Sequence, residues 1–207
     1  MSFISSIESV GEYALLMKKV LTLPDRMSEF LKEFIKGIFF LGVNSIWIVV
    51  IISFFIGAVI VLQIALNIDS PMLPRFTVGV VSREIILLEF SSSIMCLILA
   101  GKVGSNIASE IGTMRITEQI DALDIMGVNS ANYLILPKIA SFVTFMPVLV
   151  VFSMFNGLLG GYVICLILGT PSVGTYVYGI QAFFQESFIW YSMFKSMLFG
   201  FIIASVA

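Results

Sequence analysis

The clearest pattern along the chain is four long apolar runs separated by shorter polar segments. The runs cover residues 38–66, 82–101, 137–168 and 187–207 and contain few charged positions. An apolar run of about 18 residues or more predicts a helix that crosses a membrane. We therefore predict an all-α fold, a polytopic membrane helix bundle with four spans.

A polar, helix-prone segment lies between the second and third runs, within residues 100–138. Helical periodicity predicts a helix over about 108–126, whose polar face carries Glu110, Thr117, Asp121 and Asp124. A second face carries Ile116, Ile120 and Leu123. Helices that rest on lipid headgroups usually expose Lys and Arg, whereas this polar face is acidic, with Arg115 alone nearby. The pattern favours a docking surface for a protein partner over a helix that lies on the membrane.

Residues 1–37 form a leader that mixes charged and apolar positions. Apolar side chains recur at helical spacing, at Tyr13, Leu16, Val20 and Leu21. This favours amphipathic interfacial helices, broken near Pro24, over a solvated leader. The leader lacks the short apolar core and cleavage site of a signal peptide. The chain therefore divides into this leader and a membrane domain over 38–207.

The positive charges outside the spans are distributed unevenly. The leader holds five Lys or Arg and the 102–138 segment holds three, whereas the 67–83 connection holds two and 169–186 holds none. Lys and Arg gather on the cytoplasmic side of membrane proteins. We therefore predict that the N-terminus and the polar segment are both cytoplasmic.

Composition removes many functional classes. Charged residues make up 12% of the chain, hydrophobic residues 59%, and the net charge is -2, so no nucleic-acid surface is expected. The chain has no His, and its two cysteines, Cys96 and Cys165, lie inside predicted spans. We expect no metal, no cofactor and no His-dependent nucleophile. A phosphate-binding G-x-x-x-x-G-K-[ST] loop is also missing, so any ATP hydrolysis belongs to another protein.

Ionisable residues inside membrane spans are candidate functional residues. Arg83 and Glu84 open the second span, where snorkelling or a local ion pair is an equally good interpretation. Glu89 lies deeper, about 140° around an α-helix from Glu84, so these carboxylates are not expected to form a pair. Lys195 in the fourth span needs a buried partner or a polar cavity, and a Lys195–Glu89 pair stays open.

Small residues recur every fourth position at Ala100, Gly104, Ala108 and Gly112. This spacing lets membrane helices approach closely. Gly157 and Gly161 in the third span offer a second such surface. For that second pair, packing within the chain is at least as good an interpretation as contact between two copies.

The segment AGKVGSNIASEIGTMRITEQIDALDIMGVNS, residues 100–130, resembles the signature of MlaE-type ABC permeases, the membrane subunits of MCE-associated lipid transporters. Further matches are Arg83-Glu84, Pro137, Lys195-Ser196 and Phe199-Gly200, so the resemblance extends from about residue 38. The chain departs from the family at REIILLEFSSSIMC, where a Gly-Pro is common. The family also continues to a fifth span, which we expect to be missing here because Ala207 still lies in an apolar run.

The resemblance implies a homodimeric permease of a bacterial inner membrane, served by a cytoplasmic ABC ATPase and a periplasmic MCE-domain lipid-binding protein. It implies that the polar segment is the coupling helix, with Glu110, Arg115, Ile116, Ile120, Asp121, Leu123 and Asp124 at the ATPase. It also implies a lipid substrate, for which Arg83, Glu84 and Glu89 are the candidate binding residues. The protein itself is then a transport subunit and not an enzyme.

Two other functions remain as alternatives. The first is an ion-coupled secondary transporter or channel that uses Glu84, Glu89 and Lys195. The small size of this chain and its long polar segment argue against this alternative. The second is a scaffold that anchors a cytoplasmic complex, which leaves the charges inside the spans unexplained.

Overall fold

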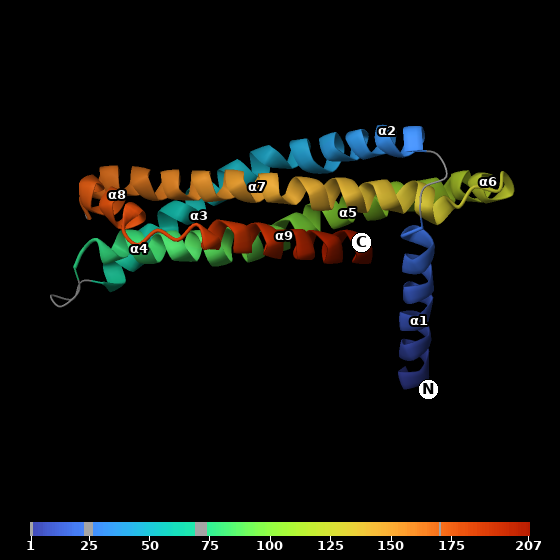
Figure 1. Ribbon diagram of the computed structural model, residues 1–207, viewed down its shortest axis with the longest axis horizontal. Coiled ribbons are helices and arrows are strands. Elements are labelled where there is room, and N and C mark those ends of the chain that lie inside the picture. The colour runs from blue at the N-terminus through green and yellow to red at the C-terminus, as the bar shows by residue number, and fades with distance from the viewer. Residues whose placement is uncertain (1, 23–26, 69–73, 170) are drawn as a thin grey trace.

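The computed structural model describes residues 2–22, 27–68, 74–169 and 171–207. Within these ranges the regular structure is helical, and four stretches are long and apolar enough to cross a membrane. They are Met27–Asn67, Thr77–Ile116, Ser130–Leu168 and Ser187–Val206. The predicted all-α membrane bundle is confirmed, with these stretches running along the long axis of the molecule (Figure 1).

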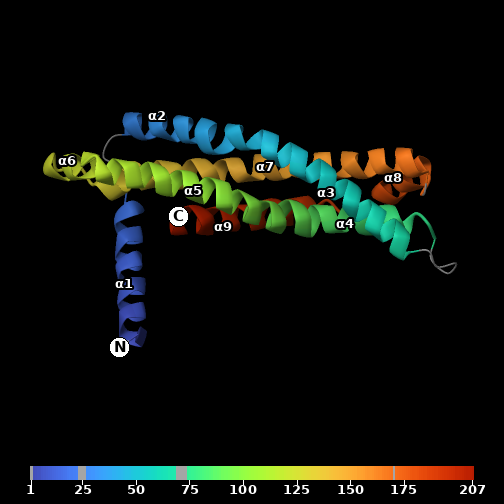
Figure 2. The ribbon, with the colours of Figure 1, turned by 180° about the vertical axis from the view of Figure 1, so that it is seen from behind.

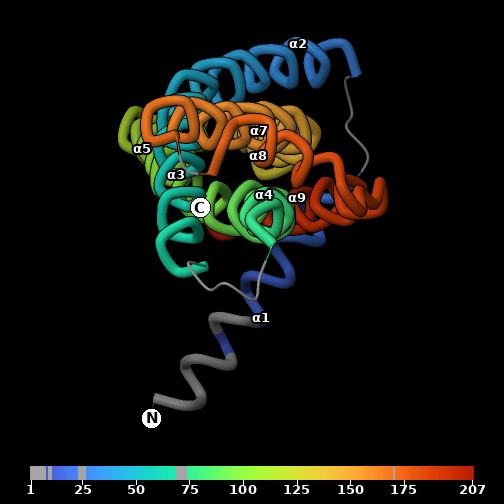
Figure 3. Tube along the Cα trace, turned by 90° about the vertical axis from the view of Figure 1, so that its left-hand side faces the viewer, coloured from blue at the N-terminus to red at the C-terminus, as the bar shows by residue number. Residues whose placement is uncertain are grey.

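The leader is continuous with the first span. Helix α2 (Met27–Gly37) leads through the π-helical η1 (Ile38–Gly42) and the 3-10 turn η2 (Val43–Ser45) into α3 (Ile46–Asn67). The expected boundary after residue 37 is therefore not a break in the helical backbone. Helix α1 (Ser2–Val20) instead stands across the bundle (Figure 1, Figure 3). Pro24, where we expected the break, lies outside the described residues.

The second span is longer than the sequence predicted and ends differently. Helix α4 (Thr77–Glu84), the π-helical η3 (Ile85–Ile94) and α5 (Met95–Ile116) form one rod. The rod stops at Thr117, whose hydroxyl donates to the Thr113 carbonyl, and Glu118 adopts a left-handed φ of 58°. A separate helix α6 (Gln119–Ile125) follows. The single helix predicted over 108–126 is therefore wrong, since the chain turns at residues 117–118.

Glycines bring α3 and α7 (Ser130–Leu168) into close contact, and these two helices form the most extensive pair in the bundle. A Cβ atom on Gly57 would overlap the Gly157 backbone, and one on Gly160 would overlap the Phe54 carbonyl oxygen. Gly161 faces the Tyr176 hydroxyl in the same way. The Gly157 and Gly161 surface is thus used for packing within the chain.

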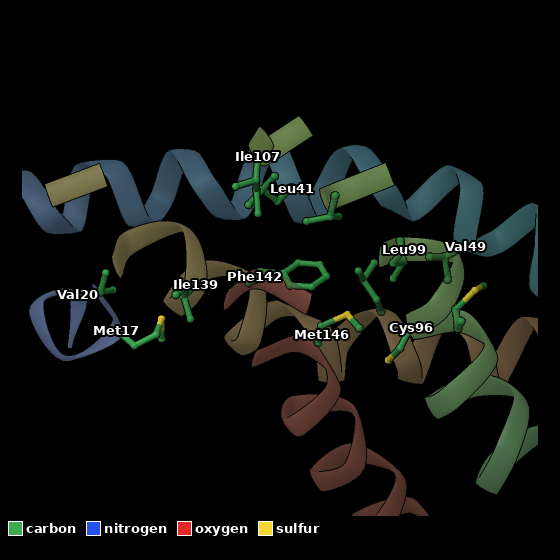
Figure 4. Packing of buried hydrophobic residues seen from close by; sticks show 14 residues of the cluster. Met17, Val20, Leu41, Val49, Cys96, Leu99, Ile107, Ile139, Phe142 and Met146 are labelled. Atoms are coloured by element: carbon green, nitrogen blue, oxygen red, sulfur yellow. The ribbon is translucent and has the colours of Figure 1, made fainter. Parts of the chain in front are cut away.

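The hydrophobic core follows α7 along its length. Phe142 and Met146 are fully buried and lie at the centre of the largest cluster, which α3 and α5 join through Val49, Cys96 and Leu99 (Figure 4). The leader contributes Met17 and Val20 to the same cluster. Cys96 and Cys165 are both buried and unbonded to each other, in different clusters, as packing residues would be.

The two ends of the bundle carry different elements. Helix α8 (Val173–Gln181) packs against α4 at one end, which we call the α8 end. The opposite end carries α6 and the junction with α1, and we call it the α6 end (Figure 1, Figure 2). Helix α9 (Ser187–Val206) returns from the α8 end along η3 and α7. A helix of 39 residues such as α7 extends well beyond the roughly 30 Å of a bilayer's hydrocarbon core.

Candidate functional site

Arg83 of α4 links this helix to the C-terminal end of α8. Its side chain is fully buried, and Nη1 donates to the carbonyl oxygens of Ile180 at 2.8 Å and Ala182 at 2.7 Å. Its Nη2 lies 3.4 Å from the carbonyl oxygen of Phe183, and the Phe184 ring lies 5.7 Å from Cζ. The final carbonyls of a helix have no partner within the helix, and a guanidinium satisfies several at once. Arg83 therefore holds the end of α8 against α4.

The segment that Arg83 holds is locally strained. Phe183 has a φ of 53°, a conformation that aromatic side chains rarely adopt, so surrounding contacts must compensate for its cost. Nearby, Tyr176 of α8 packs against Gly161 of α7 and is fully buried. Burial raises the pKa of the Tyr176 phenol above its usual range, so this group stays neutral. Arg83 and Tyr176 thus hold α8 against α4 and α7 at the α8 end.

Glu84 and Arg83 differ in accessibility although they are neighbours. The Glu84 carboxylate lies 3.4 Å from Arg83 Nη2, yet the Glu84 side chain is 44% exposed against 1% for Arg83. We predicted that both residues line a lipid site. The guanidinium is enclosed by main-chain oxygens, so Arg83 does not offer it to a ligand in this structure. Glu84 does face outward.

A second charged group lies midway along the bundle. Lys195 of α9 approaches Glu89 of η3, with 3.5 Å between Nζ and Oε2, and also donates to the Leu88 carbonyl oxygen at 3.3 Å. The Lys195–Glu89 pair that the sequence left open is therefore formed. The Glu89 side chain is 67% exposed, although it lies within an apolar membrane-spanning stretch. An exposed carboxylate at this depth implies a polar environment around it.

The π-helical form of η3 explains how these groups are arranged. A π-helix bonds residues five apart, so positions 84 and 89 approach one face instead of separating by about 140° as in an α-helix. Both glutamates are indeed accessible. Helix α9 binds two η3 carbonyl oxygens, through Lys195 at Leu88 and through the Ser192 hydroxyl at Leu87, at 2.8 Å for the latter. No pattern in the sequence indicated the role of Ser192 or the π-helix.

The α6 end presents charged and apolar side chains to its surroundings. Arg115 Nη1 lies 3.0 Å from Asp121 Oδ1, and both side chains are more than half exposed. Ile116 is 85% exposed, whereas Ile120 and Leu123 are only partly exposed. Ile125 at the end of α6 and its C-cap residue Met126 are also exposed, and the sequence pattern did not indicate either of them.

The predicted acidic face is divided in the structure. Glu110 forms an ion pair with Lys138 of α7, so it points away from the outer surface of α6. Asp121 and Asp124 remain exposed on α6. The turn at residues 117–118 causes this division, because it ends the helical register that placed these side chains together. The outer surface thus consists of Arg115, Ile116, Asp121, Asp124 and Ile125, which we call the α6 surface.

Asparagines tie the leader to the α6 end. The Asn132 side-chain amide donates to the carbonyl oxygens of Val20 at 2.7 Å and Thr22 at 2.6 Å, and Asn129 donates to Lys19 at 3.2 Å. Asn129 also caps α7 by accepting from the Asn132 backbone amide. The leader and the polar segment therefore lie at the same end of the bundle, as the charge distribution required.

The small residues of α5 at positions 100, 104, 108 and 112 are packed less closely against the rest of the described chain than the glycines between α3 and α7. A Cβ atom on Gly112 would meet nothing within 4 Å, and one on Gly104 would meet only Ala207 Cβ at 3.7 Å. Ala100 is half-buried and Ala108 is exposed. In contrast to the α3–α7 glycines, Gly104 and Gly112 have room for a Cβ atom, and we call these four positions the open α5 stripe.

Comparison with known proteins identifies relatives of the whole chain. The family model described as "Permease MlaE" matches residues 34–207. A "Probable ABC transporter permease protein" of Rickettsia bellii is 30% identical over 204 residues, covering 97% of this chain and 77% of that protein. A protein of the same description from Synechocystis, slr1045, is 33% identical over 165 residues, covering 80% of this chain and 62% of its own length.

Proposed function

This chain belongs to the MlaE permease family and is an integral membrane subunit of an ABC transporter, and we propose that it moves lipid between membranes. Energy comes from a partner ATPase, which an ABC permease requires. The α6 surface carries the ATPase part of this proposal, because it exposes acidic and apolar side chains at the end of two long helices. Because the chain belongs to an ABC permease family, we no longer favour an ion-coupled secondary transporter or channel.

The α6 surface has the properties of a docking site. Protein interfaces combine an apolar anchor with charges that select the partner. Ile116 and Ile125 provide exposed apolar area, and Asp121 and Asp124 provide negative charge that suits a basic groove. Helix α6 is joined to the second and third spans through α5 and α7. A movement of the partner at this surface is therefore transmitted directly to the membrane helices. We assign the ATPase to this surface.

The lipid path is proposed at the Glu84, Glu89 and Lys195 face. A carboxylate as exposed as Glu89 is costly against hydrocarbon, so this face suits a polar cavity between two copies of the chain. The open α5 stripe suits helix contact between such copies. Lipid headgroups then interact with Glu84 and Glu89 while tails follow apolar walls. A periplasmic MCE-domain protein receives or supplies the lipid at the α8 end.

A lipid-transfer assay tests this path. We expect Glu84→Gln and Glu89→Gln each to slow ATP-dependent transfer of fluorescent phospholipid from proteoliposomes by about tenfold, since a hydrogen bond to a charged group contributes roughly 1.5–3 kcal/mol. Glu12→Gln, an exposed carboxyl on α1 away from this face, is the matched control. All variants should retain the ATPase. Normal transfer by both glutamate variants would place the lipid path elsewhere.

Orientation is a second expectation. The α6 end carries most of the Lys and Arg, which supports our proposal that it faces the cytoplasmic side of a bacterial inner membrane. Cysteines introduced at Ser28 and Ser130 should resist an impermeant thiol reagent in intact cells, and they should react once the cells are opened. Cysteines at Asn67 and Gln185, at the α8 end, should react from outside. The native Cys96 and Cys165 are buried and give little background. Labelling of Ser28→Cys from outside would reverse the orientation.

A further inference from the structure

A cavity at the α6 end lies apart from the proposed lipid path. It has a volume of about 700 Å³, which is within the range of small-molecule sites, and it is lined by α2, η1, α5, α6 and α7. Its apolar wall includes Phe40, Met114, Leu123 and Leu134. None of the five residues of the α6 surface is among the residues that line this cavity. The cavity and the α6 surface are therefore separate features of the same end.

Two ion pairs line this cavity. Lys36 and Glu33 pair along α2 at 2.5 Å, and Lys138 of α7 pairs with Glu110 of α5. The four groups supply two positive and two negative charges, so the rim is neutral overall yet strongly polar. A ligand that carries both a cation and an anion matches this arrangement. A purely anionic ligand would be repelled by the two carboxylates.

The charged rim lies at the level where hydrocarbon begins. Lys36 is followed by the apolar run that starts at Ile38, and Lys138 is followed by the apolar run of α7. On the opposite side of α2, Leu31 and Ile35 are exposed, at 50% and 62%, as expected for a helix at a membrane interface. The cavity therefore has charged groups at headgroup depth and apolar walls beside them.

We propose that this cavity binds one zwitterionic phospholipid of the adjoining leaflet, at a site separate from the transported lipid. The phosphate lies between Lys36 and Lys138, and the headgroup amine lies near Glu33 and Glu110. The first carbons of the tails contact Phe40 and Leu134. Because α2 and α6 both line the cavity, the bound lipid bridges the leader to the segment that carries the α6 surface.

Photolabelling in nanodiscs tests the proposal with the permease purified together with its ATPase. Two probes are compared at equal mole fraction, a phosphatidylethanolamine and a phosphatidylglycerol, each with a diazirine near the start of one tail. We expect the phosphatidylethanolamine probe to label peptides containing Phe40, Met114 or Leu134 several-fold more than the other probe. Lys36→Glu should lower this labelling by about tenfold, because it puts like charge beside the phosphate.

Two matched variants keep the result interpretable. Lys32→Glu lies on the same helix and breaks a similar pair, with Glu29 at 3.0 Å, but lies outside the cavity, so labelling should persist. Leu134→Trp fills the cavity without changing charge and should abolish labelling. Equal labelling by both probes, or equal loss in Lys32→Glu and Lys36→Glu, would overturn the proposal. Labelling that appears only when the ATPase is removed would also overturn it, since the cavity would then be a protein interface.

Discussion

The two ends of the bundle use arginine in opposite ways. At the α8 end Arg83 is enclosed and donates to main-chain carbonyls of residues 180, 182 and 183. At the α6 end Arg115 lies in the open, paired with Asp121 beside the bare Ile116 side chain. The first arrangement completes hydrogen bonds that the fold would otherwise lack. The second leaves charge and apolar area available to another molecule.

This difference shows that a charged residue near a membrane span has two distinct uses. When its partners are buried carbonyls of the same chain, the residue holds the fold together. When its surroundings are exposed and mixed with apolar side chains, it suits a partner. Burial and hydrogen-bond partners therefore decide the role, and residue type alone does not.

The largest expected effect on stability comes from removing the buried arginine. Arg83→Ala leaves three carbonyls without their charged donor and should lower the free energy of unfolding by about 3 kcal/mol, or the Tm by roughly 10 °C. Arg115→Ala, the same change at the exposed end, should cost less than about 1 kcal/mol. Thermal unfolding of the purified permease in one detergent measures both. Equal losses would remove the distinction between the two ends.

Much of this fold follows from sequence pattern. The four spans and the shared end of the leader and polar segment follow from hydropathy and charge. The turn at residues 117–118 does not, because the helical periodicity of the side chains continues through it and only the left-handed Glu118 shows the break. The π-helix of η3 is equally hidden, since it depends on carbonyls that α9 satisfies from a distant part of the sequence.

Some of the predicted site residues are accessible in the structure and others are not. Glu84 and Glu89 are accessible, as a ligand site requires, whereas Arg83 is not. Its partners lie about a hundred residues away, and no local pattern indicates them. Glu110 likewise pairs with Lys138 of α7, a contact that no local pattern indicates. Contacts between distant segments, which periodicity does not encode, account for these differences.

A smaller effect is expected from small residues, which show the same contrast between internal and open surfaces. Gly160→Ala places a methyl group on the Phe54 carbonyl in the α3–α7 contact and should destabilise the permease by about 2 kcal/mol. Gly112→Ala on the open α5 stripe meets no atom within 4 Å and should be neutral or stabilise the helix by up to about 1 kcal/mol. Unfolding in denaturing detergent compares the two variants. A destabilised Gly112→Ala monomer would show that the stripe is packed internally.

The most direct test of the account is charge reversal on the α6 surface. Asp121→Lys with Asp124→Lys changes only exposed side chains, so the permease should insert and unfold like the native protein. Like charges placed across an interface cost several kcal/mol. We therefore predict that the doubly reversed permease no longer retains the ATPase in a pull-down and that lipid-stimulated ATP hydrolysis is lost. Lys18→Glu with Lys32→Glu, a reversal of equal size at two exposed leader lysines outside the cavity, should leave retention intact. If the doubly reversed protein still purifies with a fully active ATPase, the α6 surface does not couple the permease to its energy source.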